Sequence, residues 1–195
     1  MKVIFLDVDG ELTYSNYKNK ETANIDIEKV KMLKEICDIT DAKVVISSSW
    51  REAKNHTPDI YGLLINILKN NGINVIGDTP AIETKIEENF ANMQKLFTLD
   101  DLERFKPKYG TGRAAEIQKY LSEHQIENFV ILDDEDWEWS DYGYEKHWIQ
   151  PTWFGNGGLK REHVIKAVEI LNKKKAADNQ NVFLDCPDVI EVSDN

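Results

Sequence analysis

Four short runs of aliphatic and β-branched residues, each leading into polar or glycine-containing sequence, constrain this chain more than any other feature. The runs are Val3 to Leu6, Val44 to Ile46, Asn74 to Ile76 and Phe129 to Leu132. Because their apolarity is continuous rather than alternating, they are typical of strands covered on both faces of a sheet. A fifth, shorter strand is expected near His147 to Gln150.

Helical segments separate the expected strands. One begins near Asp26, and another has Thr57 as its cap, Pro58 as its first residue, and Asn71 with Gly72 at its end. Three helices show apolar faces: Val30, Leu33 and Cys37; Leu64, Ile67 and Leu68; Val164, Val168 and Leu171. Strands that alternate with helices predict an α/β fold, a doubly wound parallel sheet with helices on both faces. Ligands of such sheets bind beyond the carboxyl ends of the strands.

The stretch from Asp78 to Gly112 is unusually long for a connection between a strand and a helix. Thr79 and Pro80 resemble a cap and first helical residue, and apolar residues then recur from Ile82 at spacings of three or four. We therefore predict one domain over residues 1–195, with a small helical insert at about 79–105 that shades the carboxyl ends of the strands.

The overall charge limits the classes of partner. Thirty-five acidic residues against twenty-four basic ones give a formal charge of −11, which disfavours sequence-independent binding to a phosphate backbone. A small basic rim around one pocket is still compatible with this charge. The two cysteines lack the spacing of a zinc site. With no signal peptide pattern and no apolar stretch of membrane-spanning length, a cytoplasmic protein without membrane contact is expected.

Polar clusters follow three of the expected strands. Asp7 and Asp9, with Gly10 allowing a sharp turn, follow the first strand. Ser47 and Ser48 follow the second strand, and the acidic run 133–136 follows the fourth. Because the carboxyl ends of parallel strands share one edge of the sheet, these clusters are expected to form a single site.

The first motif, an aspartate, any residue, an aspartate and a glycine after the first strand, resembles that of the haloacid dehalogenase (HAD) superfamily. The serine and acidic motifs follow in the superfamily's order. More narrowly, the segments VVISSSWR, NFVILDD and GLKREHVIKAVEIL are similar to the phosphatase-type HAD domains associated with Swiss Army knife RNA repair proteins. The resemblance implies a Rossmann-like fold and a magnesium-dependent phosphohydrolase.

The resemblance also implies roles for individual residues. Asp7 would attack phosphorus, and Asp9 would act as general acid and base. Mg²⁺ would be held by the Asp7 carboxylate, the Asp9 backbone carbonyl, and Asp133 with Asp134. Asp136 is kept as a reserve ligand, because the acidic run leaves the register open.

Phosphate binding in this superfamily needs a hydroxyl and a cation. Ser47 is the first candidate for the hydroxyl and Ser48 the alternative. Arg113 is the preferred cation. A positive charge in the first turn of a helix opposes the helix dipole and costs stability unless an anion binds nearby, which favours a functional role. Lys108 is the second candidate cation.

Two features depart from the superfamily pattern. Glu11 stands where a small or β-branched residue is usual, and its carboxylate would repel a phosphate unless it turns outward or touches the metal. Five tryptophans either fill the core or line the site: Trp50, Trp137, Trp139, Trp148 and Trp153.

Hydrolysis of a phosphomonoester is the leading functional prediction, with a phosphorylated small molecule, a nucleotide or a polynucleotide end as substrate. One alternative is a catalytically weak module that binds phosphate or nucleotide. Another is a structural domain that binds a protein partner. The retained pair Asp7 and Asp9 favours the enzyme, because catalytic decay usually removes one of these acids.

Overall fold

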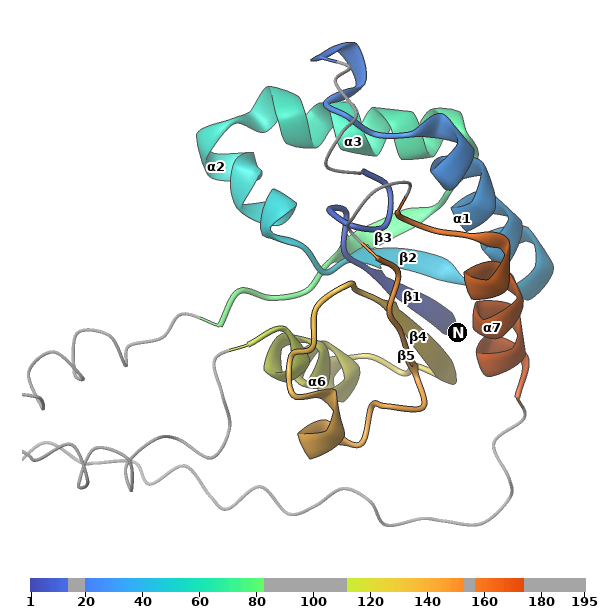
Figure 1. Ribbon diagram of the computed structural model, residues 1–195. Helices are drawn as coiled ribbons and strands as arrows, with labels where there is room; N and C mark the ends of the chain where they lie inside the picture. The colour runs from blue at the N-terminus through green and yellow to red at the C-terminus, as the bar shows by residue number, and fades with distance from the viewer. Residues whose placement is uncertain (14–19, 83–111, 153–156, 174–195) are drawn as a thin grey trace, which may run out of the picture.

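A five-stranded parallel sheet forms the centre of the protein in a computed structural model that describes residues 1–13, 20–82, 112–152 and 157–173 (Figure 1). The strand order is β3-β2-β1-β4-β5, so β1 lies in the middle. The bounds are Lys2–Leu6 for β1, Lys43–Ile46 for β2, Val75–Asp78 for β3, Asn128–Leu132 for β4 and Trp148–Ile149 for β5. The predicted α/β fold is confirmed, including the short fifth strand.

Helices cover both faces of the sheet. On one face lie α1 (Ile27–Thr40), α3 (Pro58–Asn70) and α7 (Arg161–Asn172), and α1 packs directly against α7 (Figure 1). The other face is covered by α6 (Arg113–Glu123) and the short 3₁₀ helix η3 (Trp139–Tyr142). A 3₁₀ turn, η1 (Lys20–Thr22), precedes α1, while η2 (Ser49–Glu52) and α2 (Ala53–His56) connect β2 to α3.

The central strand β1 shows why continuous apolarity was informative. Ile4 and Leu6 pack into the core beneath α1, α3 and α7, whereas Val3 and Phe5 pack into the core beneath α6. Successive side chains of a strand point to opposite faces, so both sets must be apolar when both faces are covered. All four side chains are fully buried.

Local signals place the helix ends where the sequence predicted them. The Asp26 side chain accepts a hydrogen bond from the Glu28 amide at the start of α1, which satisfies a free N–H group of the first turn. Pro58 opens α3, and Gly72 follows its end with a φ of +74°. The Thr57 side chain makes no capping hydrogen bond, so the proline alone gives the start signal there.

The predicted helix start at Pro80 is wrong, because residues 79–82 are not helical. The Thr79 amide donates to the Ile46 carbonyl, and the Thr79 hydroxyl accepts a hydrogen bond from Arg51. These contacts hold Thr79 against β2 as a continuation of β3. The rest of the predicted insert, with Lys108, lies outside the described residues, so its helix stays a prediction.

None of the described helices is long and apolar enough to cross a membrane.

Candidate active site

Three neighbouring strands bring the predicted motifs to one edge of the sheet. The Asp7 amide donates to the Leu132 carbonyl at 2.9 Å, and the Ser47 amide donates to the Leu6 carbonyl at 2.8 Å. The ladder hydrogen bonds therefore continue one residue beyond the strands and fix where the first polar residues begin. The sequence prediction that these motifs meet at the carboxyl ends is confirmed for Asp7, Ser47 and Asp133.

Arg113 links the three motifs through one nitrogen. Its Nη1 lies 2.6 Å from Asp7 Oδ1, 2.5 Å from the Ser47 carbonyl and 3.2 Å from Asp133 Oδ2. Burial alone would lower the pKa of Arg113, but the charges of Asp7 and Asp133 raise it overall. The two carboxylates therefore offset the unfavourable position of a cation in the first turn of α6.

Asp7 is buried, and its surroundings act on the pKa of its carboxylate in opposite directions. Burial raises the pKa of Asp7, while the Arg113 charge and hydrogen bonds from Ser48 and Arg113 act to lower it. The net direction is upward. Burial strips water from the Asp7 carboxylate, while the Arg113 charge favours its ionised form.

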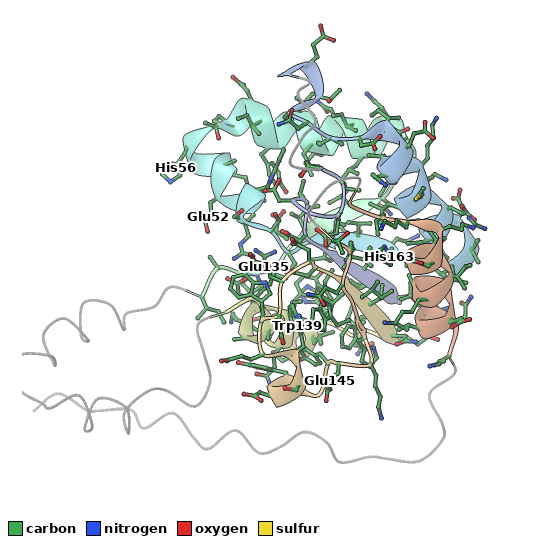
Figure 2. All side chains as sticks on the ribbon, in the orientation of Figure 1. Glu52, His56, Glu135, Trp139, Glu145 and His163 are labelled. Carbon is green, nitrogen blue, oxygen red and sulfur yellow. The ribbon has the colours of Figure 1, made fainter. Side chains whose placement is uncertain are left out.

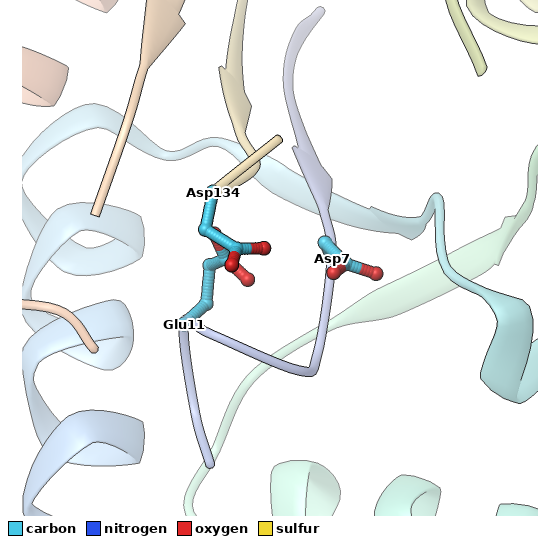
Figure 3. A group of neighbouring side chains, drawn as sticks. All are labelled: Asp7, Glu11 and Asp134. Carbon is cyan, nitrogen blue, oxygen red and sulfur yellow. The ribbon is translucent and has the colours of Figure 1, made fainter. Parts of the chain in front are cut away.

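Asp133 and Asp134 are neighbours with different surroundings. Asp133 Oδ1 accepts from the Glu135 amide and the Trp137 indole, and Oδ2 accepts from Arg113. Burial raises the pKa of Asp133 to about 8 although Arg113 opposes the shift. Asp133 therefore positions Arg113 and the loop that follows β4, whereas Asp134 extends toward the loop that follows β1 (Figure 3).

Asp7, Glu11 and Asp134 form an acidic cluster, defined by carboxylate oxygens that all lie within 4.8 Å of one another (Figure 3). Burial, then the charge of Asp7, raises the pKa of Asp134 to about 6. Burial and the charges of Asp7, Asp133 and Asp134 raise the pKa of Glu11 well above its usual value. Such a set of oxygens suits a hard divalent cation.

Gly10 makes the close approach of Asp134 possible. It has a φ of +88°, and a Cβ atom on it would lie 2.5 Å from the Cγ atom of Asp134. Any other residue would be strained in this conformation and would displace the Asp134 carboxylate. The sequence indicated the turn at Gly10, but it gave no sign of this contact.

Asp9 is held by two donors that come from different segments. Thr13 Oγ1 donates to Asp9 Oδ1 at 3.0 Å, and Trp50 Nε1 donates to Asp9 Oδ2 at 2.8 Å. Trp50 lies in η2, where the Ser48 hydroxyl accepts from the Trp50 amide. The sequence indicated Trp50 only as a residue of the core or of the site lining, and its position directly after the serine motif was the one signal for this contact.

Three other tryptophans support the acidic loop after β4. Trp137 places its ring 5.1 Å from the Arg113 guanidinium carbon, and Trp148 donates to the Asp133 carbonyl at 2.7 Å. Trp139 is fully buried on the α6 side of the sheet and donates to the Glu135 carbonyl (Figure 2). These side chains serve packing and positioning together, and Trp153 lies outside the described residues.

Ser47 and Ser48 are both buried but differ in availability. Ser48 bonds to Asp7 and to the Trp50 amide. The Ser47 hydroxyl has no hydrogen-bond partner among the described residues. A buried hydroxyl without a partner is unfavourable, so Ser47 is the one of the two that has a free group for a ligand.

The fold and the site together define a Rossmann-like α/β protein with a buried acidic centre at the carboxyl edge of a parallel sheet. Residues 3–164 match the HAD domain in Swiss Army Knife RNA repair proteins, and the chain belongs to this family. The match begins in β1 and ends in α7, so the predicted resemblance is confirmed across the whole described sheet. Family membership indicates a HAD-type hydrolase. Comparison with curated proteins and with solved structures gives no significant match.

Proposed function

We propose that this HAD-type hydrolase is a magnesium-dependent phosphomonoesterase that forms an aspartyl phosphate on Asp7. The loop that follows β1, called the first loop from here on, carries Asp7 and Asp9. The observation that carries the proposal is the contrast between these two acids. Asp7 is buried beside Arg113, while Asp9 accepts hydrogen bonds from Thr13 and Trp50. One loop thus presents a carboxylate suited to attack and a second one oriented for proton transfer.

The residues present fit magnesium. All candidate ligand atoms are oxygens, and the two Glu11 oxygens are buried without a hydrogen-bond partner among the described residues. Asp7, Asp134 and the backbone carbonyl of Asp9 would hold the ion. Asp133, also predicted as a ligand, already bonds through both oxygens, so we assign it to positioning Arg113. When bound, magnesium would neutralise the charge of the phosphoryl group and of its attacker.

The side chains then account for both chemical steps. Asp7 forms a bond to phosphorus as the ester oxygen leaves, and Asp9 gives that oxygen its proton. Asp9 next takes a proton from water, whose oxygen attacks phosphorus and breaks the bond to Asp7. The Arg113 guanidinium and the Ser47 hydroxyl would hold phosphoryl oxygens during both displacements.

The substrate we propose is a nucleotide or a phosphorylated polynucleotide end. The family match to an RNA repair HAD domain favours these over sugar phosphates. The formal charge of −11 disfavours tight binding along a nucleic acid backbone and fits recognition of a terminal phosphate.

A second candidate function is a phosphate-binding module with little turnover. One observation favours it: Arg113 is engaged by Asp7 and Asp133, and a bound phosphate must compete with both for the guanidinium. In an active enzyme, magnesium would relieve this competition by drawing Asp7 toward the ion.

A phosphatase screen of the purified protein tests the proposal. Nucleotides, oligonucleotides with a phosphate at either end and sugar phosphates are compared with millimolar magnesium and with EDTA, and Asp7→Asn serves as the blank. We expect magnesium-dependent phosphate release that Asp7→Asn lacks. Phosphate binding without release from any substrate would support the second candidate, and release that persists in EDTA would exclude the magnesium mechanism.

A further inference from the structure

We propose that Glu11 is a direct magnesium ligand, so that this protein holds the ion with three side-chain carboxylates, those of Asp7, Glu11 and Asp134. The inference rests on the magnesium site of the proposed function. It also accounts for the residue by which the first loop departs from the superfamily pattern.

The first observation is the isolation of the Glu11 carboxylate. Its side chain is 0% exposed, and neither oxygen has a hydrogen-bond partner among the described residues. Burying a carboxylate without a partner is strongly unfavourable, so buried charges in proteins are paired or coordinate metals. Among the described acids of the cluster, Glu11 thus has the clearest need for a counter-charge.

The second observation is direction. The Glu11 carboxylate points toward Asp134 and Asp7, and the three groups converge on one space at the end of β1 (Figure 3). Opposite ligands of an octahedral magnesium ion lie roughly 4 Å apart. Because the three oxygens already lie within 4.8 Å of one another, only small movements would bring them onto one ion.

The third observation is that the backbone at Glu11 is held in place. Its carbonyl accepts the Leu159 amide at 2.9 Å, and the next residue, Leu12, donates to the Val8 carbonyl. Gly158, with a φ of +81°, approaches so closely that a Cβ atom would lie 2.8 Å from the Glu11 carbonyl oxygen. The loop is therefore fixed on two sides, which sets the direction in which the Glu11 side chain leaves the backbone.

A magnesium titration without substrate tests the inference. Calorimetry and thermal melting compare the wild type with Glu11→Gln, which keeps the size of the side chain but removes its charge. The matched control is Glu138→Gln, which removes one exposed charge from the loop that follows β4. We expect Glu11→Gln to bind magnesium about tenfold or more weakly. Glu138→Gln should stay near the wild type, and metal-free Glu11→Gln should melt higher than the wild type.

Glu11→Val provides the second variant, because a β-branched residue is usual at this position and should fold. If either folded variant binds magnesium as tightly as the wild type, Glu11 is not a ligand, and hydrolysis by the wild type would still stand. If the wild type binds magnesium through Glu11 but hydrolyses no ester, the proposed function fails and the ligand assignment stands. If the wild type binds no magnesium, both are overturned.

Discussion

At the scale of single residues, two acids that are close in the sequence have very different surroundings. Asp7 and Asp9 are two residues apart, yet one contacts a buried guanidinium and the other an indole N–H and a hydroxyl. Environment is what gives two identical carboxylates different chemical roles. The loop supplies both environments because three strand ends and η2 converge on it.

Substitution of each acid should separate the two chemical steps. Asp7→Asn should abolish turnover, since an amide is a poor nucleophile. Asp9→Asn should keep magnesium affinity and lose about two to four powers of ten in kcat. With aryl phosphates, whose leaving groups need little protonation, Asp9→Asn should lose less of the rate of the first step. Mass spectrometry of this variant should then detect a phosphorylated peptide that carries Asp7. Substantial activity in pure Asp7→Asn would instead indicate direct attack by water.

Trp50→Phe tests the positioning of Asp9. The substitution keeps an aromatic ring in η2 but removes the N–H that Asp9 accepts. A hydrogen bond to a charged group contributes about 1.5–3 kcal/mol, so kcat should fall by about tenfold to a hundredfold while KM changes little. In the Asp9→Asn background the same substitution should have almost no further effect. Equal losses in both backgrounds would mean that Trp50 acts only through packing.

The stability of the metal-free protein should carry a pH signature from Asp134. Burial raises the pKa of Asp134 from 3.8 to about 6, so the folded state binds the proton more tightly than the unfolded state. Its contribution to stability is therefore present at low pH and is lost as the pH rises through about 6. In EDTA, the melting temperature of Asp134→Asn relative to that of the wild type should increase as the pH is raised from about 4 to about 7. A constant difference across this range would contradict the assignment.

At the scale of secondary structure, β1, β2 and β4 were predictable because each carries a continuous run of buried apolar residues, whereas β3, at the edge of the sheet, is only partly buried. The starts of α1 and α3 were predictable because capping and proline act within a few residues. Thr79 and Pro80 gave the same local signal as Thr57 and Pro58. The outcome differed because Thr79 hydrogen-bonds to β2 and to Arg51, and these contacts come from distant parts of the chain.

In the candidate site, too, the features set by local structure were predictable and those set by contacts between distant segments were not. The sequence identified Asp7, Ser47 and Arg113, whose positions at strand or helix ends follow from local structure. It did not show that Trp50 bonds to Asp9 or that Asp133 and Asp134 face different partners. Those contacts depend on the packing of η2 and of the loop after β4 against the first loop. Local sequence patterns do not determine this packing.

Gly10→Ala should show how the first loop and the acidic loop depend on each other. The positive φ alone should cost about 1–2 kcal/mol in the free energy of unfolding, and the clash with Asp134 adds to this and weakens magnesium binding. Gly62→Ala is the matched control. It lies within α3 with open space around its α-carbon, and alanine should stabilise there by about 0.5–1 kcal/mol. Normal magnesium binding by Gly10→Ala in calorimetry would remove Asp134 from the metal site.

At the scale of the whole molecule, an acidic protein must attract an anionic substrate through a few local charges. The formal charge is −11, and the cation at the centre of the described site is Arg113. Long-range attraction therefore contributes little, and recognition must come from close contacts of the substrate with the protein. The stretch that follows β3 starts at the same edge of the sheet, since Thr79 bonds to Ile46 at the end of β2.

Shortening that stretch should change selectivity while leaving the chemistry intact. Thr79 belongs to the sheet through its bonds to Ile46 and Arg51, so the deletion should begin after Ile82 and rejoin the chain before α6 with a short flexible linker. The variant should still hydrolyse a small aryl phosphate in a magnesium-dependent manner, because every described residue assigned to catalysis remains. Its ratio of kcat/KM between a phosphorylated oligonucleotide and a mononucleotide should shift, if the segment contacts the substrate beyond its phosphate. A second variant keeps the length of the natural segment but scrambles its sequence. It separates the effect of the segment's sequence from the effect of its size. Loss of the cooperative unfolding transition on deletion would show that the segment belongs to the core, and the single domain with an insert would have to be redrawn.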